Sequence, residues 1–289
     1  ADCSAGPTGE AGFEAEAGRY HLYVAGSCPW AHRTLIWRQL KGLEDIVSIS
    51  IAQARKNSQG WTFEEGEWLI RDHVNGATYL HQIYTLAEPG YSGRVTVPTL
   101  WDKRRGTIVN TESSEIVRML DTAFDGVGAA GPELYPAALR PEIDALNERI
   151  YASLNNGVYR CGFASSQAAY DEAIGPLFET LDYLEGLLAE RRYLTGERLT
   201  EADWRLFPTL ARFDLAYHGN FKCNLRRLVD YPNLWGYTRE LYQIPGIAET
   251  MNIEQIKTGY YTIQAVNPTG IVPAGPDIDF TQPHGRDES

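Results

Sequence analysis

A cysteine stands where a predicted strand passes into a predicted helix, and this junction narrows the choice of folds more than any other part of the chain. Residues 20–24 (YHLYV) are aromatic and β-branched, which predicts a strand. Pro29 directly follows Cys28 and suits the first position of a helix, where its missing N–H costs nothing. The apolar spacing that follows predicts a helix over residues 29–40, and Gly42 is its stop signal.

The strands and helices predicted after this helix follow the order of a known fold. Residues 46–51 read as a second strand, residues 97–101 and 107–109 as a hairpin, and residues 113–120 as a short helix. The resulting order, β-α-β followed by β-β-α, matches the thioredoxin fold. The connection over residues 52–96 is long for a compact domain, so we expect it to shape a site.

The second half of the chain has helical spacing instead. Helices are predicted over residues 141–155, 167–191, 201–217 and 232–242. Thr200 and Asp203 form an N-cap signature, because both side chains can accept from the first N–H groups of a helix.

These patterns predict two domains. The predicted parts are a thioredoxin-like α/β domain over residues 1–130 with its insertion at 52–96, a linker over 131–140, and an all-α domain with an extended tail over 141–289.

Composition limits the partners and the compartment. The chain has 289 residues, a formal charge of −12 and a pI near 5.0, so it repels nucleic acid and anionic membranes at long range. No run of about 18 apolar residues predicts a membrane span, and the start of the chain lacks the pattern of a secretion signal. We expect neither nucleic acid nor membrane as a partner.

The cysteines indicate a reducing compartment and no metal. Cys3, Cys28, Cys161 and Cys223 are widely spaced and form neither a CxxC pair nor a disulfide scaffold. A zinc site needs clustered ligands, so metal binding is not expected. The cytoplasm is the predicted location, and every cysteine except Cys28 is interpreted as structural or incidental.

The position of Cys28 predicts a reactive thiolate. Its sulfur faces the first N–H groups of the helix, and helix N-termini lower a thiol pKa from about 8.5 into the range of roughly 3.5–7.5. His32 and Arg33 add positive potential one turn later. The alternative is an inert buried cysteine. Because Ala31 stands where a CxxC motif has its second cysteine, oxidised Cys28 needs an external thiol and hence a mixed disulfide.

Several sequence blocks together carry a family resemblance. They include residues 28–33 (CPWAHR), 60–63 (GWTF), 91–98 (YSGRVTVP), 193–196 (YLTG) and 267–273 (NPTGIVP). From Phe13 to Pro273 the chain resembles the xi-class glutathione transferases, the glutathionyl-hydroquinone reductases. The resemblance implies a thioredoxin-like domain followed by an all-helical one, and a homodimer. It also implies that glutathione is a co-substrate and that Cys28 removes it from S-glutathionyl-hydroquinones through a mixed disulfide.

The resemblance places glutathione-binding residues in the first half. A cis bond between Val97 and Pro98 would expose backbone to the cysteinyl part of glutathione, although Pro98 can also be an ordinary edge-strand proline. Glu112 and Ser113 would hold the γ-glutamyl end, although Ser113 can be only an N-cap.

Residues of the insertion and of the helical half complete the implied site. Trp61 and Arg94 would contact glutathione, against the alternatives of core packing and surface solvation. Tyr159, Tyr217 and Tyr260 would line the hydroquinone pocket, with Tyr261 as a near alternative to Tyr260, although most tyrosines simply pack.

Two other functions stay open. One is an omega-like thiol transferase or dehydroascorbate reductase, and the other is a non-catalytic binding protein on the same scaffold. The long insertion and the tail over residues 266–273 favour the quinol reductase, and the intact Cys28 opposes the binding protein.

Overall fold

The computed structural model describes residues 10–53 and 59–286. Within these residues the chain forms two compact units. The first unit comprises the described residues up to Glu133 together with Glu249–Gln255, and the second comprises Leu134–Ala248 together with the described residues from Ile256 onward. Cys3 lies outside the described residues.

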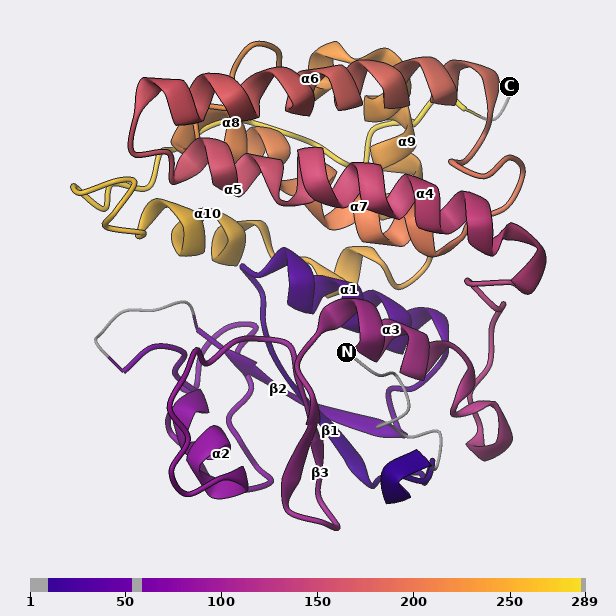
Figure 1. Ribbon diagram of the computed structural model, residues 1–289, viewed down its shortest axis with the longest axis vertical. Helices are drawn as coiled ribbons and strands as arrows, with labels where there is room; N and C mark the ends of the chain where they lie inside the picture. Colours follow the sequence, from indigo (N-terminus) through magenta and orange to yellow (C-terminus); the bar gives the residue numbers. More distant parts are fainter. Residues whose placement is uncertain (1–9, 54–58, 287–289) are drawn as a thin grey trace. The chain divides into compact units, whose positions relative to one another are not determined.

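The first unit contains a mixed four-stranded sheet in the order β2-β1-β3-β4 (Figure 1). The fully buried strand β1 (Tyr20–Ala25) pairs in parallel with β2 (Val47–Ala52). On its other side β1 pairs antiparallel with β3 (Thr99–Asp102), which pairs antiparallel with β4 (Thr107–Asn110). The thioredoxin-like order predicted from the sequence is therefore confirmed.

Three helices accompany the sheet. The helix α1 (Pro29–Leu40) has the predicted bounds, and α3 (Ser113–Thr122) extends slightly beyond its prediction. Figure 1 shows α1 and α3 side by side, with α2 (Leu80–Ala87) apart from both. The helix α2 lies inside the long connection and was not predicted, because it is short and its first turn is fixed by a tertiary bond from Leu80 N to the Trp61 carbonyl (3.0 Å). The short 3-10 turns Glu10–Gly12 and Asp125–Val127 lie near the two ends of this unit.

The second unit is helical. Its helices are α4 (Arg140–Ile150), α5 (Gly157–Gly162), α6 (Gln167–Glu190), α7 (Glu201–Arg212), α8 (His218–Asn220), α9 (Pro232–Gln243) and most of α10 (Ile253–Tyr261). Short 3-10 turns occupy Ala137–Leu139 and Leu228–Asp230. A further 3-10 turn, Ala248–Thr250, starts at the last residue before the segment Glu249–Gln255 of the first unit. The four helices predicted from spacing are confirmed, whereas the shorter α5, α8 and α10 were missed because short runs show little periodicity.

Two of the predicted helices change geometry before they end. The prediction over 141–155 becomes α4 followed by a π-helical turn, Tyr151–Asn155, and the prediction over 201–217 becomes α7 followed by a second π-helical turn, Phe213–Tyr217. Each π turn inserts extra backbone and so shifts the direction of the side chains that follow it. Spacing alone does not reveal such a turn, because the residues around it remain helical.

The predicted N-cap of α7 is confirmed. Thr200 and Asp203 form a reciprocal capping box. The Asp203 carboxylate accepts from Leu194 N (3.0 Å), Thr200 N (2.8 Å) and the Tyr237 hydroxyl (2.9 Å), so it joins the start of α7 to a preceding loop and to α9.

The described tail after α10 contains no helix or strand and is tied back onto the second unit. Phe280 packs against Trp235 and Tyr242, and Arg286 donates to the Glu240 carboxylate at 2.8 Å. Across the described residues, no helix is both long enough and apolar enough to cross a membrane.

Candidate active site

Cys28 lies at the junction that the sequence predicted. The strand β1 ends at Ala25, and a turn closed by Cys28 N and the Ala25 carbonyl (3.1 Å) leads into α1. Cys28 is the N-cap of α1 with extended backbone (φ −81°, ψ 120°), and Pro29 is the first helical residue. The half-buried thiol donates to the Val97 carbonyl at 3.5 Å. The sulfur therefore lies between a helix N-terminus and the chain that enters β3.

The predicted cis bond between Val97 and Pro98 is confirmed. The predicted strand over 97–101 is corrected, because β3 begins only at Thr99. Proline has no N–H to donate to a ladder, so the strand pairing starts after it. Val97 is thus buried beside the Cys28 thiol but stands outside the β3 ladder, which leaves its backbone suited to a strand-like contact with a ligand.

The start of α3 provides an anion-binding geometry in the same unit. Ser113 is the first residue of α3 and is buried, whereas its N-cap Glu112 is exposed. Arg33 of α1 donates to Ser113 Oγ at 3.5 Å, and its guanidinium lies 4.6 Å from the centre of the Trp30 ring. A helix N-terminus backed by a buried cation favours a carboxylate. The sequence placed Arg33 near Cys28 but did not predict its contact with Ser113.

His32 is held by a distant part of the chain. Its buried ring hydrogen-bonds Thr250 Oγ1 at 2.8 Å, which joins α1 to the segment Glu249–Gln255 of the same unit. No sequence signal predicted this contact, because 218 positions separate the two residues.

Trp61 and Arg94 lie in the long connection between β2 and β3. Trp61 is half-buried, and its carbonyl accepts from Leu80 N at the start of α2. Arg94 is exposed, and its carbonyl accepts from the Tyr91 hydroxyl at 2.7 Å. Both bonds shape the connection itself, so the glutathione-binding roles of the two side chains stay predictions.

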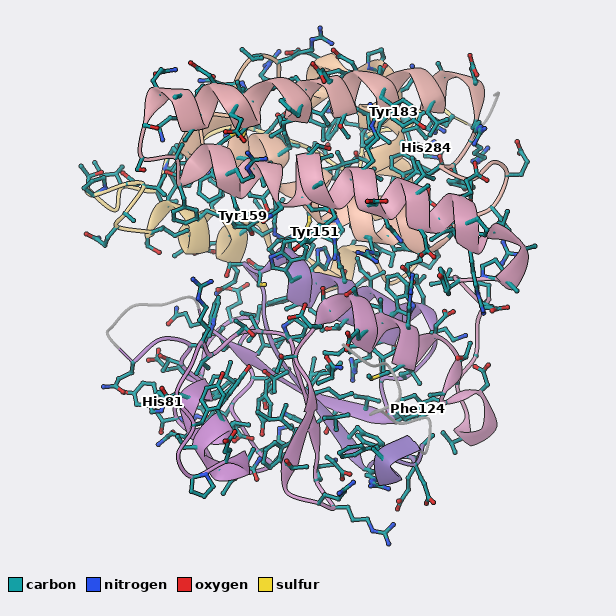
Figure 2. All side chains as sticks on the ribbon, in the orientation of Figure 1. His81, Phe124, Tyr151, Tyr159, Tyr183 and His284 are labelled. Atoms are coloured by element: carbon teal, nitrogen blue, oxygen red, sulfur yellow. The ribbon has the colours of Figure 1, made fainter. Side chains whose placement is uncertain are left out.

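The structure brings together the three tyrosines predicted for the second unit. The Tyr260 hydroxyl lies 2.6 Å from that of Tyr159 and 2.8 Å from that of Tyr217, so it is the centre of a hydroxyl chain. Tyr159 projects from α5, as Figure 2 shows, and is half-buried, while the other two are buried. Burial raises the pKa of Tyr260 well above its ordinary value, with the two neighbouring tyrosines adding to the effect. Tyr260 therefore stays protonated at neutral pH and can donate a hydrogen bond.

Local irregularities place these tyrosines. One π turn immediately precedes α5, which carries Tyr159, and the other ends at Tyr217. Phe221 fills the space between them, with its ring centre 5.5 Å from that of Tyr159 and 5.5 Å from that of Tyr217. A Cβ on Gly162 would lie 2.3 Å from the Phe221 ring, so this glycine admits the ring. The role of Phe221 in this cluster was not predicted from the sequence.

Two further cysteines lie in the second unit. Cys161 and Cys223 are buried in the second unit, and Cys223 Sγ lies 4.0 Å from the Val158 carbonyl. Among residues 10–53 and 59–286, no three His, Cys, Asp or Glu side chains are grouped to hold a metal ion.

Comparisons with known proteins agree with this arrangement. The family model described as "Glutathione S-transferase, N-terminal domain" matches residues 27–123, and the one described as "Glutathione S-transferase, C-terminal domain" matches residues 167–240. The chain is 57% identical to glutathionyl-hydroquinone reductase PcpF of Sphingobium chlorophenolicum, over 92% of this chain and 86% of that protein. It is 53% identical to glutathionyl-hydroquinone reductase YqjG of Escherichia coli K12, over 99% and 88%.

Solved structures give the same result. The glutathione-bound structure of YqjG superposes with a TM-score of 0.94 over 97% of this chain and 92% of that chain, at 53% identity. A xi-class glutathione transferase from Natrialba magadii superposes with a TM-score of 0.93 over 96% and 85%, at 50% identity.

A thioredoxin-like sheet with a cysteine at a helix N-terminus, joined in one chain to an all-helical unit, defines an enzyme of the glutathione transferase superfamily. Within that superfamily the chain belongs to the xi class, the glutathionyl-hydroquinone reductase family.

Proposed function

We propose that this protein is a glutathione-dependent reductase that removes glutathione from S-glutathionyl-hydroquinones, with Cys28 as its nucleophile. The observation that carries the proposal is the Cys28 thiol at the N-cap of α1, facing the Val97 carbonyl beside a cis proline. The relatives named as glutathionyl-hydroquinone reductases, at 57% and 53% identity over most of the chain, support the same activity.

The first half-reaction breaks a carbon–sulfur bond. The Cys28 thiolate attacks the sulfur of the glutathionyl group, and a disulfide forms between the protein and glutathione. The electron pair of the broken bond goes to the ring carbon, which takes a proton from a general acid. The hydroquinone carbon is thereby reduced, and the two sulfurs together are oxidised by two electrons.

The second half-reaction restores the enzyme. A second glutathione, as thiolate, attacks the glutathione sulfur of the mixed disulfide and leaves as oxidised glutathione. The Cys28 thiolate is released, so the sum converts one glutathionyl-hydroquinone and one glutathione into hydroquinone and oxidised glutathione. Ala31 leaves the helix without a resolving cysteine, which supports this dependence on an external thiol.

We assign glutathione binding to residues of the first unit. The Val97 backbone beside Pro98 pairs with the cysteinyl part, and the N-terminus of α3 with Ser113 and Glu112 holds the γ-glutamyl end. The contact of Arg33 with Ser113 supports this assignment, because the buried guanidinium favours an anion there. We assign Trp61 and Arg94 to the remaining part of the tripeptide.

We assign the hydroquinone to the tyrosine cluster of the second unit. The hydroxyls of Tyr159, Tyr217 and Tyr260 form a hydrogen-bonded chain that can bind phenolic oxygens, and aromatic rings suit a planar ligand. We also propose that the protein works as a homodimer in the cytoplasm.

Replacement of the nucleophile tests the proposal. In Cys28→Ser we expect turnover of a glutathionyl-hydroquinone to fall to background and the glutathione adduct to disappear from the protein mass spectrum, while glutathione still binds. The control is Cys161→Ala, which we expect to retain turnover because Cys161 is a buried residue of the second unit. Dehydroascorbate and a small mixed disulfide, assayed alongside, distinguish the omega-like alternative. A fully active serine variant would contradict the proposed chemistry.

A further inference from the structure

Trp68 adopts a backbone conformation that its side chain disfavours. It lies in the turn Gly66–Leu69, which is closed by a bond from Leu69 N to the Gly66 carbonyl (3.1 Å). At the third position of this turn Trp68 has a φ of 60°, in the left-handed region. That position usually belongs to glycine or asparagine, and a bulky residue there is held by its surroundings against a conformational cost. Such an outlier points to a functional constraint.

The indole of Trp68 lies against Gly26. A Cβ built on Gly26 would be 2.5 Å from Cζ3 and 3.1 Å from Cε3 of the indole, and 3.2 Å from the Gln255 Cβ. Gly26 does not need glycine for its own backbone, because its φ is outside the left-handed region. The glycine is needed because the ring occupies the space that a side chain would take.

Gly26 belongs to the turn that presents the nucleophile. The turn runs from Ala25 to Cys28 and is closed by the bond from Cys28 N to the Ala25 carbonyl. The position of this turn decides whether the sulfur faces the first N–H groups of α1. The indole thus packs on the segment that sets the place of Cys28.

Packing alone does not explain why the ring stays there. Trp68 also borders a cavity of about 190 Å³, lined in part by Leu35, Ile51, Ile70 and Thr250. The ring therefore has open space on another side. Trp68 thus combines a left-handed backbone with an indole that packs on Gly26.

We propose that Trp68 is a positioning residue for Cys28, a wedge that holds the Ala25–Cys28 turn so that the sulfur stays at the N-terminus of α1. The proposal rests on Cys28 being the working nucleophile, as argued under the proposed function. Trp68 itself touches neither the thiol nor the reacting atoms in this account. It is distinct from Trp61, which we assign to glutathione.

The test variant is Trp68→Gly, which removes the wedge while suiting the left-handed backbone, so the fold is retained. The probe is iodoacetamide, with the alkylation rate followed from pH 5 to pH 9 in a Cys3→Ser background, since Cys161 and Cys223 are buried. We expect the alkylation profile to shift to higher pH and kcat to fall roughly tenfold to a hundredfold, the range for a displaced reacting group. KM for glutathione should stay within about twofold of the wild-type value, because the change does not alter the residues assigned to glutathione binding.

Two controls separate positioning from general damage. Trp68→Phe keeps a ring on Gly26 and should restore most of the wild-type alkylation profile. Glu67→Ala changes an exposed residue in the same turn and should leave the alkylation profile unaltered. The alkylation profile needs no quinol substrate. It therefore tests the wedge even if glutathionyl-hydroquinone proves not to be the substrate.

A double-mutant cycle with Gly26 completes the test. Gly26→Ala alone should displace the ring and shift the profile in the same direction as Trp68→Gly. In the Trp68→Gly background the added methyl group no longer meets the indole and keeps its contact with the Gln255 Cβ, so the second change should have a smaller further effect than in the wild type. An unshifted profile in folded Trp68→Gly, or in Gly26→Ala, would overturn the proposal, and so would additive effects of the two changes.

Discussion

His21 carries a neutral imidazole inside the sheet of the first unit. Its ring lies between the hydroxyls of Ser48 (2.8 Å from Nδ1) and Ser50 (2.9 Å from Nε2) on the neighbouring strand. Ser50 donates to the Arg71 carbonyl, which leaves Nε2 to donate to Ser50. In the neutral ring Nδ1 is then an acceptor, and it lies closer to the Ser48 hydroxyl than the Tyr20 carbonyl does, at 2.8 Å against 3.4 Å. Burial lowers the pKa of His21 to about 3, and the nearby charges of His73, Lys103 and Arg38 act in the same direction.

This residue makes stability depend on pH. The unfolded chain binds a proton at His21 below its ordinary pKa near 6.5, while the folded chain does not until about pH 3. The stabilisation is complete above pH 6.5 and is lost as the pH falls toward 3. At pH 5 the loss is about 2 kcal/mol relative to pH 7.

We therefore expect the free energy of unfolding in urea to fall less from pH 7 to pH 5 in His21→Gln than in the wild type. The difference in unfolding free energy between the two proteins should change by about 2 kcal/mol across that interval. Parallel stability curves for the two proteins would show that the imidazole titrates normally in the fold.

At the scale of elements, the start of α7 depends on one buried carboxylate. Asp203 accepts from two backbone N–H groups and the Tyr237 hydroxyl, and also from the Thr200 hydroxyl at 3.0 Å. Burial raises the pKa of Asp203 above its ordinary value, although every one of these hydrogen bonds opposes that rise. The helix cap and the packing of α9 thus share a single acceptor.

Asp203→Ala should destabilise the protein by about 3 kcal/mol or more, since a lost cap costs about 1 kcal/mol and each buried donor left unpaired costs about 1–3 kcal/mol. The free energy of unfolding in urea measures the effect. Glu197→Ala, an exposed carboxylate in the preceding loop, serves as the control and should change stability by less than about 0.5 kcal/mol. Equal losses in both variants would refute the role of the cap.

At the scale of the whole molecule, charge and exposed apolar surface act in opposite directions on self-association. The formal charge of −12 makes two copies of the chain repel each other. Exposed apolar side chains in the second unit, among them Phe163, Leu225 and Ile271, favour association. The proposed homodimer therefore has to overcome an electrostatic cost that salt reduces.

We expect light scattering to give twice the chain mass of 32.3 kDa at physiological ionic strength. On dilution, the dimer should dissociate at a higher protein concentration in low-salt buffer than in 0.5 M salt. The reason is that low salt leaves the repulsion between the two negatively charged copies unscreened. A monomer mass at every salt concentration would rule out the homodimer.

Features that depend on neighbours along the chain were predictable. The bounds of α1 follow from Pro29 and the apolar spacing, and the capping box of α7 follows from Thr200 and Asp203. The cis bond before Pro98 and the family followed from sequence blocks that resemble known ones. The helix bounds and the cap are local features, because helix caps, turn residues and periodic spacing act over a few positions.

Features that join distant residues were decided by tertiary packing. The chain alone does not show that Trp68 lies on Gly26, that His32 bonds Thr250, or that Phe221 fills the tyrosine cluster. The π turns that direct Tyr159 and Tyr217 were equally hidden. The physical reason is that each such contact depends on the summed packing of whole elements, and close packing between elements carries no periodic signature along the sequence.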